Sequence, residues 1–469
     1  MKTPILDMLS SIAKGAGVRF CMPGHKGKGV LFGGVHKYDI TELPSADNLH
    51  MPSGVIRQSQ DLHAGFIGAK QSFYSVNGST ACVQAAVLSA LSPNDKILAA
   101  RDIHISAISA FALSGAQVEF IHPSHYHDSL PSVITPADVS RAISLHPDAT
   151  ALYVTYPNYY GLCMDIAEVC RIAHSSGLTV ICDGAHSATF DFSDLLPLSC
   201  AYAGCDLFTA SLHKTLPAMN QCATLSVGTG TNIKSSIVKE RLNMLQTTSP
   251  SYLLLASADY ALSYMREYGK SGIARVISLV EETMKKIEAL GGYRCATQDI
   301  EKATGAYDRD ILRLVVDVTD RGISGIGAAR YLAKQSVYVE AADAKHILLI
   351  CTISDDAEDY AALLSALSGI RGADYSVEEH NRPLIDYRIF EKQPQIPIRD
   401  AVFSKKRYVP FEESAGQISA ASVGAYPPGV PLLVPGQQIT NEMIDHICEL
   451  RQHGYSLFGE QGGFAVADI

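Results

Sequence analysis

The stretch Thr209-Ala-Ser-Leu-His-Lys-Thr-Leu-Pro-Ala-Met-Asn-Gln221 places a lysine directly after a histidine and three residues after a serine. The stretch lacks the charges that mark an ordinary solvated face. A lysine amine becomes nucleophilic near neutral pH only where burial or a neighbouring cation lowers its pKa. We therefore interpret Lys214 as a reactive, half-buried amine. The alternative is a surface lysine near a turn.

On both sides of this stretch, short apolar runs alternate with amphipathic runs. Strands are expected at 72–76, 96–100, 117–121, 151–155, 178–182, 207–208 and 224–227, and helices at 81–91, 106–114 and 165–176. This order predicts an α/β protein with a mostly parallel sheet covered on both faces. In such sheets, ligands bind beyond the carboxyl ends of the strands. A smaller C-terminal α/β domain is expected from strands at 311–318, 338–340 and 346–351 and helices at 328–334 and 356–367, after a linking helix at 273–290.

The predicted division of the chain has four parts. Residues 1–52 form an N-terminal arm, which opens with a short helix after Thr3 and packs on another subunit. Residues 53–300 form the large domain, and residues 301–370 form the small α/β domain. Residues 371–469 form a C-terminal extension, in which the prolines predict rigid turns rather than regular structure.

The composition of the 469 residues is that of a globular protein, with 47% hydrophobic and 18% charged residues. The net charge is −10 and no basic run stands out, so nucleic acid is not an expected partner. No apolar run reaches the roughly 18 residues of a membrane span, and Asp7 interrupts any signal-peptide core. The eleven cysteines include no CxxC pair, which indicates a reduced, cytoplasmic chain. We interpret Cys200 and Cys205 as buried thiols.

The segment Asn77-Gly78-Ser79-Thr80 lies between an expected strand and an expected helix. Free backbone N–H groups at the helix start, together with the hydroxyls of Ser79 and Thr80, would form a phosphate cradle. The alternative is an ordinary helix N-cap, because serine and threonine favour that position.

Asp183 ends an apolar strand, where a carboxylate needs a cationic partner. A protonated pyridine nitrogen would be such a partner and would make the ring an electron sink. The alternatives are a helix cap or a core salt bridge. His186 could contact a phenolic oxygen of the same ring, and the flat ring of His104 could stack on its face, although both could simply be buried histidines.

These elements follow one another as phosphate loop, stacking histidine, aspartate and lysine, each after a strand of the same predicted sheet. Their joint occurrence is far more specific than any one of them. We predict that Lys214 holds pyridoxal 5′-phosphate as a Schiff base. No metal site is predicted: His122, His125 and His127 have metal-like spacing, but no expected strand or helix orients them, and we interpret them as part of a solvated loop.

At these residues the chain resembles the prokaryotic ornithine/lysine/arginine decarboxylases, which are pyridoxal enzymes of the aspartate-aminotransferase fold (fold type I). The resemblance covers most of the chain. It rests on Met22-Pro-Gly-His-Lys26, Val76-Asn-Gly-Ser-Thr80, Asp183-Gly-Ala-His186, Ser211-Leu-His-Lys-Thr-Leu-Pro217, Leu245-Gln-Thr-Thr-Ser-Pro-Ser-Tyr252 and Tyr426-Pro-Pro-Gly-Val-Pro431. The last two motifs separate this family from ordinary aminotransferases.

The resemblance implies a role for each matched residue. Lys214 would bond the cofactor aldehyde, Asp183 the pyridine nitrogen, and His104 would stack on the ring. His186 would lie near the phenolic oxygen or the substrate carboxylate. The phosphate would be held by Gly78, Ser79, Thr80, Ser211 and His213, with Thr248 and Ser249 reaching the phosphate of a neighbouring subunit. The family forms dimers or dimer-built oligomers.

The chain also departs from the family pattern. Ile105 replaces a lysine after the stacking histidine, and Asn220 replaces a small hydroxyl residue. Ala421 and Gln437 stand where the family has glutamates. A cationic substrate side chain needs carboxylates to pair with, so these losses bear on the substrate more than on the cofactor. The other candidate carboxylates are Asp47, Glu412 and Glu413, for which a solvated surface position is the alternative.

The predicted activity is α-decarboxylation of a basic amino acid, with arginine first and lysine or ornithine next, giving agmatine or a diamine that is a polyamine precursor. Lys214 or His186 would return a proton to the carbanion. The alternative is another fold-type I pyridoxal enzyme, such as an acyl-transferring α-oxoamine synthase or an aminotransferase, because Asp-x-Ala-His also occurs there. A non-catalytic pyridoxal-dependent regulator is a third possibility, against which the acidic balance argues.

Overall fold

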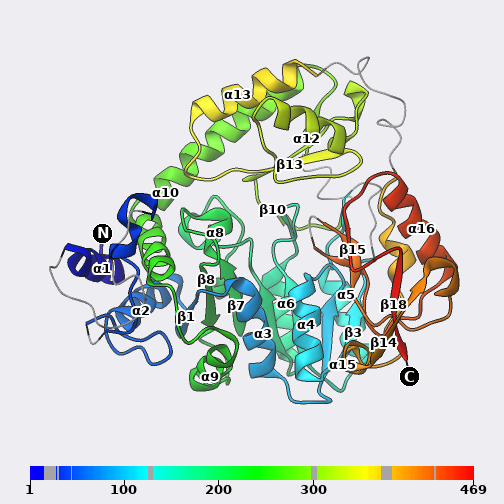
Figure 1. The fold of residues 1–469 in the computed structure, drawn as a ribbon, viewed down its shortest axis with the longest axis horizontal. Helices are drawn as coiled ribbons and strands as arrows, with labels where there is room; N and C mark the ends of the chain where they lie inside the picture. Colours follow the sequence, from blue (N-terminus) through cyan, green and yellow to red (C-terminus); the bar gives the residue numbers. More distant parts are fainter. Residues whose placement is uncertain are drawn as a thin grey trace. The chain divides into compact units, whose positions relative to one another are not determined.

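The computed structural model describes residues 1–14, 28, 31–43, 45–124, 130–296, 304–370, 383–426 and 429–468 (Figure 1). The chain divides into two compact units. The first comprises Met1–Ala90 and Thr179–Gly272, and the second comprises Leu91–Leu178 and Ile273–Ile469. Each unit is described separately, and the four-part division into arm, large domain, small domain and extension stays a prediction.

The first unit contains the strands that carry the lysine stretch. Its strands run in the order β1-β8-β7-β6. Their bounds are β1 (Gln71–Ser75), β6 (Thr179–Asp183), β7 (Leu207–Ser211) and β8 (Ala223–Val227). β6 and β7 are parallel, whereas β8 pairs antiparallel with both β7 and β1. β8 is buried along its whole length, as expected for a strand covered on both faces.

The first unit also contains helices. They are α1 (Pro4–Lys14), α2 (Val55–Ile67), α3 (Gly78–Ala90), α7 (Cys200–Ala203), α8 (Leu212–Thr215), α9 (Ser235–Leu245) and the first part of α10 (Tyr252–Ala289). α3 is rich in alanine and valine, and it packs against β7, β8 and α9. α1 begins at Pro4, as predicted, and its first N–H groups are held by Asp259, which accepts from Ile5 N at 2.9 Å.

In the second unit, three parallel strands run in the order β4-β2-β3. They are β2 (Lys96–Ala100), β3 (Gln117–Ile121) and β4 (Ala149–Thr155), and the helices α4 (Ile105–Ser114), α5 (Pro136–Leu145) and α6 (Ile166–Ser175) accompany them. α5 starts with a capping box, in which Thr135 and Asp138 each accept from the other's backbone N–H. Together with the parallel pair β6–β7 in the first unit, these strands confirm the predicted mostly parallel α/β class.

A smaller antiparallel sheet follows α10, as predicted. Its order is β12-β13-β11-β9. It is built from β9 (Arg294–Cys295), β11 (Arg313–Asp317), β12 (Ala341–Ala342) and β13 (His346–Ile350), with α12 (Gly325–Lys334) and α13 (Ala357–Ser368) packing together beside it. The prediction of a strand at 338–340 was wrong, because the strand that pairs with β13 begins at Ala341.

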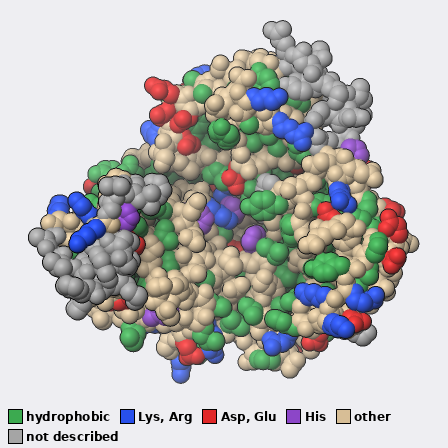
Figure 2. All heavy atoms as spheres, viewed as in Figure 1, with side chains coloured by type: hydrophobic (Ala, Val, Ile, Leu, Met, Phe, Trp, Pro, Cys, Tyr) green, Lys and Arg blue, Asp and Glu red, His purple; other side chains and the backbone are tan. Residues whose placement is uncertain are grey.

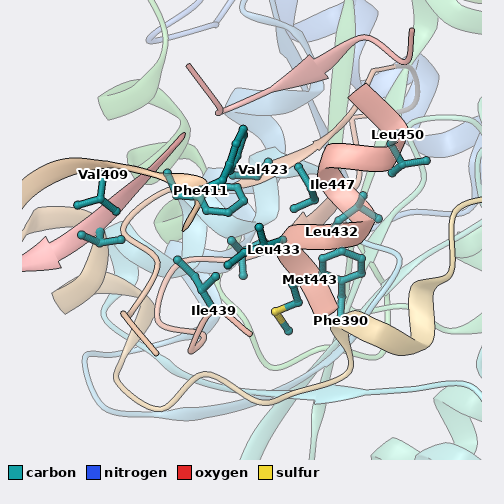
Figure 3. Packing of buried hydrophobic residues seen from close by; sticks show 13 residues of the cluster. Phe390, Val409, Phe411, Val423, Leu432, Leu433, Ile439, Met443, Ile447 and Leu450 are labelled. Atoms are coloured by element: carbon teal, nitrogen blue, oxygen red, sulfur yellow. The ribbon is translucent and has the colours of Figure 1, made fainter. Parts of the chain in front are cut away.

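The C-terminal extension has regular structure where we predicted turns. It contains α15 (Ile398–Phe403), β14 (Lys405–Pro410), β15 (Val423–Ala425), β16 (Pro431–Leu433), α16 (Asn441–Gln452), β17 (Leu457–Phe458) and β18 (Gly463–Asp468). These elements enclose a hydrophobic core (Figure 3). In this core the ring centroids of Phe411 and Phe464 lie 4.9 Å apart in an edge-to-face arrangement. Pro410 and Pro431 misled the prediction because they are the last residue of β14 and the first residue of β16, positions that a strand tolerates.

Two further differences concern helices. The linking helix, predicted from residue 273, is part of α10, which spans 38 residues and starts at Tyr252. α2, α5 and α9 were missed. No helix within the described ranges has the length and apolar character needed to span a lipid bilayer. On the face seen in Figure 2, basic and acidic side chains are interspersed in small groups.

Candidate active site

Lys214 lies at the carboxyl end of β7, where the four-residue helix α8 follows the strand directly. Leu212 and Thr215 are buried and anchor this turn, which leaves Lys214 half-buried. Leu212 N donates to Cys222 O at 3.0 Å, and this bond fixes the start of α8 to the chain before β8. The Lys214 Nζ lies 3.0 Å from Nε2 of His186. The lysine therefore has a neighbouring base with which it can exchange a proton.

Asp183 ends β6, which neighbours β7 in parallel, and it lies opposite Thr209 in the register. Its side chain is buried, and Oδ1 accepts from Ala185 N at 3.1 Å and from Thr209 Oγ1 at 3.2 Å. The next residue, Gly184, could not carry a side chain, because a Cβ there would lie 2.6 Å from the Thr209 carbonyl oxygen. The sharp turn at Gly184 leads to His186, which is also buried. Asp183 and Lys214 thus stand at the carboxyl ends of neighbouring strands, with His186 next to the lysine, and their roles toward a cofactor stay predictions.

The predicted phosphate cradle belongs to the same unit. α3 begins at Gly78, three residues earlier than expected, so Ser79 and Thr80 lie in its first turn, where backbone N–H groups lack helical acceptors. Gly78 has φ +70°, a conformation that a residue with a side chain rarely adopts. Its N–H donates to Gln221 O at 3.0 Å, which ties the cradle to the end of the lysine stretch. Thr80 itself is exposed.

Two hydroxyls beside Lys214 are buried without a hydrogen-bond partner in the described part of the chain. They are Ser211 Oγ, at the end of β7, and Thr215 Oγ1, in α8. Such orphaned groups cost free energy unless a ligand bonds them. His213 Nδ1 lies 3.0 Å from Cys222 O, so this nitrogen carries the proton, and burial lowers the pKa of the ring. His213 could donate to a phosphate only through Nε2 of its protonated form.

The remaining predicted cofactor residues are Thr248, Ser249 and His104. Thr248 and Ser249 are exposed in the segment between α9 and α10, and Ser249 Oγ lies 3.1 Å from Thr247 Oγ1. Their contact with a neighbouring subunit stays a prediction. His104 belongs to the second unit, where it caps α4 through the bond from Ser106 N to its Nδ1 at 3.2 Å. Its stacking role also stays a prediction.

Cysteines surround the strand that ends at Asp183. The thiol sulfurs of Cys182, Cys200 and Cys205 lie within 4.8 Å of one another, and those of Cys182 and Cys200 are 3.6 Å apart. Cys200 and Cys205 are buried, which confirms their interpretation as buried thiols. The described cysteines that are buried and form no disulfide are Cys82, Cys163, Cys170, Cys182, Cys200, Cys205, Cys222, Cys295 and Cys351, whereas Cys448 is partly exposed.

Gln437, one of the positions where the family has an acid, has a structural role in this chain. It is fully buried, and its Oε1 accepts from Val434 N at 2.9 Å. Its Nε2 donates to Phe390 O at 3.2 Å and also to the carbonyl oxygen of Lys392. A carboxylate has no proton to donate to those two carbonyls. The surroundings of position 437 are therefore suited to an amide rather than to an anion.

We expect Gln437→Glu to lower the free energy of unfolding by about 2–4 kcal/mol, because a buried charge would face two carbonyl oxygens. Burial would raise the pKa of the new carboxyl above its unfolded value, so the folded chain would bind the proton more tightly. Stability would then fall as pH rises, and the loss would be larger at about pH 8 than at about pH 5. Urea unfolding at both pH values measures it. Gln438→Glu, at a half-buried neighbour, is the control, and equal losses in the two variants would contradict the prediction.

The other departures and candidate carboxylates take ordinary positions. The Asp47 carboxylate accepts from the backbone N–H groups of Asn48, Ser53, Gly54, Ile56 and Arg57 before and within the first turn of α2. Burial alone would raise the pKa of Asp47, but these backbone donors together lower it. Asp47 is thus committed to capping. Glu412, Glu413 and Asn220 are exposed, and Ile105 N donates to Gly429 O at 3.2 Å.

Three residues at the site were missed from the sequence. Thr209 orients Asp183, Thr215 supplies an orphaned hydroxyl, and Gln221 fixes Gly78. All three lie in the lysine stretch itself, so the signal was their position on the strand and turn beside Lys214. The motif Met22–Lys26 and the histidines His125 and His127 lie outside the described residues.

The residues present fit pyridoxal phosphate. A reactive amine at Lys214, a buried carboxylate at Asp183 and the orphaned hydroxyl of Ser211 are the groups that its aldehyde, ring nitrogen and phosphate require. The open N-terminal turn of α3 offers further phosphate donors. These groups belong to one compact unit, so their arrangement does not depend on the placement of the second.

Comparison with known proteins gives the family. Residues 3–304 match the model of the Orn/Lys/Arg decarboxylase major domain, and residues 387–459 match that of the Orn/Lys/Arg decarboxylase C-terminal domain. An arginine decarboxylase of Bacillus anthracis is 33% identical, over 98% of this chain and 95% of that protein. An arginine decarboxylase of Bacillus subtilis is 32% identical, over 98% and 96%.

A solved structure gives the same fold. The lysine decarboxylase of Francisella novicida superposes with a TM-score of 0.86 over 99% of this chain and 80% of that one, at 17% sequence identity. The resemblance seen in the motifs around Lys214 is thereby confirmed over nearly the whole length. The chain belongs to the Orn/Lys/Arg decarboxylase family.

Proposed function

We propose that this protein decarboxylates a basic amino acid at its α-carbon, using pyridoxal 5′-phosphate held at Lys214. The observation that carries the proposal is the Lys214 Nζ at 3.0 Å from His186 Nε2, beside a buried Asp183 at the end of the neighbouring strand. Arginine is the first candidate substrate, because the relatives at 32–33% identity are named arginine decarboxylases. Lysine and ornithine come next.

Each residue of the cluster has a role in this proposal. When bound, the cofactor supplies a protonated ring that accepts the electrons released as carbon dioxide leaves. Asp183 would keep the proton on the ring nitrogen, and Thr209 and Ala185 N hold its carboxylate in place. His186 would take a proton from Lys214 Nζ, which leaves the amine nucleophilic. After carbon dioxide has left, Lys214 or His186 would return a proton to the α-carbon.

The phosphate is proposed to lie between the start of α3 and the end of β7. Ser211 Oγ and the N–H groups of Ser79 and Thr80 are the donors in place for it. Thr248 and Ser249 are proposed to reach the phosphate of a second subunit, since both are exposed. The working form would then be a homodimer or an oligomer built from dimers.

The test is a substrate panel on purified protein with added pyridoxal phosphate. We expect ¹⁴CO₂ from carboxyl-labelled arginine, with agmatine as the product, and slower or no release from lysine and ornithine. A cadaverine or putrescine product with faster turnover would move the substrate to lysine or ornithine. Amino transfer from any of the three without carbon dioxide release, or carbon dioxide release only with an added acyl thioester and with an aminoketone as the product, would refute the decarboxylase assignment in favour of the alternative pyridoxal enzymes.

A further inference from the structure

The second unit contains a cavity of about 510 Å³ that shares no residue with the Lys214 cluster. Its walls include residues at the carboxyl ends of three parallel strands: Arg101 and Asp102 directly after β2, His122 directly after β3, and Asn158 to Tyr160 in the loop that follows β4. The C-terminal extension supplies Leu384 to Arg388 and Val430, and Lys345 comes from the small sheet region. The carboxyl ends of parallel strands are where this class of fold binds ligands.

Asp102 is the carboxylate in this cavity with an unmet hydrogen-bonding oxygen among the described residues. It lies deep in the unit but keeps part of its surface accessible, as expected of a cavity wall. Its Oδ2 is buried without a hydrogen-bond partner among the described residues. Burial raises the pKa of the Asp102 carboxyl to about 7. A ligand cation would both bond the orphaned oxygen and favour the ionised form.

The neighbouring arginines are already engaged, so they do not neutralise Asp102 by direct bonding. The Nη1 atom of Arg101 donates to Pro431 O at 2.7 Å, and its Nη2 atom donates to the carbonyl oxygen of Leu432. The Arg101 guanidinium carbon also lies 5.3 Å from the centre of the Phe120 ring. Arg388 bonds both oxygens of Asp386, at 2.8 and 2.7 Å. The carboxylate at 102 is thus left for a donor that the ligand brings.

Two tyrosines form an aromatic corner in the same wall. The rings of Tyr159 and Tyr160 are 6.2 Å apart between centroids and inclined at 79°. Their hydroxyls donate to Glu340 at 2.7 Å and to Asp343 at 2.8 Å, which fixes both rings. Aromatic faces beside a carboxylate are the usual surroundings of a bound organic cation. His122, whose pKa burial lowers to about 4, is neutral at pH 7, and neither of its ring nitrogens has a hydrogen-bond partner among the described residues.

We propose that this cavity of the second unit is a binding site, built from residues that are not part of the Lys214 cluster, for an alkylammonium or alkylguanidinium ion held by Asp102 and the Tyr159–Tyr160 corner. The ligand class goes with the proposed function, since a basic amino acid and the amine made from it both carry such a group. The amino acid and the amine differ because only the amino acid carries a carboxylate. Lys345, which lines the cavity, would pair with that carboxylate. The fraction of protein with this site occupied would rise with the concentration of substrate or product.

The experiment is isothermal titration of the full-length, cofactor-loaded protein with two probes that have no primary amine and cannot bond the cofactor. Butylguanidinium carries the cation alone, and Nα-acetylarginine carries the cation with a carboxylate. We expect butylguanidinium to bind and Asp102→Asn to weaken its binding about tenfold or more. Tighter binding of Nα-acetylarginine would identify an amino acid as the ligand, and equal or weaker binding would identify an amine.

Three variants make the test specific. Asp148→Asn, at a 64% exposed surface carboxylate that pairs with Lys96, should bind the probe as the natural protein does. Asp183→Asn should also leave binding intact, because the Lys214 cluster is not involved. Tyr159→Leu should weaken binding while keeping the carboxylate, and it covers the case in which Asp102→Asn does not fold.

The proposal is overturned if butylguanidinium does not bind at millimolar concentration, if butyrate binds in its place, or if Asp102→Asn and Tyr159→Leu both bind as the natural protein does. Loss of binding in Asp183→Asn would place the probe at the cofactor cluster and overturn it as well. Because the titration requires no turnover, its result is independent of the substrate panel. A protein that binds butylguanidinium but releases no carbon dioxide would refute the decarboxylase assignment and leave the cavity site standing.

Discussion

Replacing Lys214 with alanine is expected to abolish turnover, with a fall in kcat of about 10⁵-fold or more. The side chain provides the amine that bonds the cofactor aldehyde and the group that exchanges a proton with His186 Nε2 at 3.0 Å. Alanine removes both roles, and no other described lysine lies in the lysine stretch. Turnover is measured by release of labelled carbon dioxide from the best substrate of the panel.

A second measurement on the same variant is independent of activity. Borohydride reduction of the cofactor-loaded natural protein should leave the cofactor on the peptide that contains Lys214, and the variant should show no labelled peptide. Lys270→Ala is the matched control, because that side chain is 81% exposed in the same unit and forms a surface ion pair with Asp194 at 3.4 Å. Label on another lysine, or near-normal turnover, would show that position 214 does not carry the cofactor.

Asp183→Asn is expected to lower kcat by about a thousandfold while leaving the fold and the Lys214 adduct in place. Asparagine can still accept from Thr209 Oγ1 and Ala185 N, which bond the natural carboxylate at 3.2 and 3.1 Å. It carries no negative charge, so it would not keep a proton on the ring nitrogen. The expected fall in kcat therefore comes from weaker electron withdrawal by the cofactor ring, and cofactor binding is expected to be retained.

The control for this variant is Asp194→Asn, at a carboxylate that is 95% exposed. We expect that control to retain natural activity, and Asp183→Asn to be labelled by borohydride at Lys214. If Asp183→Asn were as active as the natural protein, the carboxylate would not be the partner of the ring nitrogen. If it lost both activity and the adduct together, Asp183 would serve mainly to build the site.

The strands near Lys214 could be predicted from the sequence because they are buried on both faces and appear as short apolar runs bounded by polar turns. β2 and β3 were predicted with the bounds they have. The first part of α10 could not be, because its apolar and polar residues do not separate onto faces as they do in a surface helix. The C-terminal extension was predicted wrongly for a related reason. A proline in the sequence predicts a turn, whereas the short strands here are evident only from the packed core (Figure 3).

For the site, the sequence supplied the residue types and their order along the chain, which was enough to bring Lys214, Asp183 and His186 together. It did not supply contacts between residues far apart in the chain, such as Gly78 N to Gln221 O. The cavity at Asp102 was also out of reach, since its walls come from strand ends, the small sheet region and the tail. A single sequence does not show which of its many carboxylates lacks a partner.

The buried cysteines provide built-in probes of conformational opening, because their labelling measures when the surrounding structure opens. Five of them, Cys82, Cys182, Cys200, Cys205 and Cys222, lie in the first unit, and four, Cys163, Cys170, Cys295 and Cys351, lie in the second. A small thiol-alkylating reagent can modify them only when the surrounding structure opens, and mass spectrometry of the peptides dates each event. Because the thiols are divided between the units, one labelling time course would show whether the halves open together or one before the other.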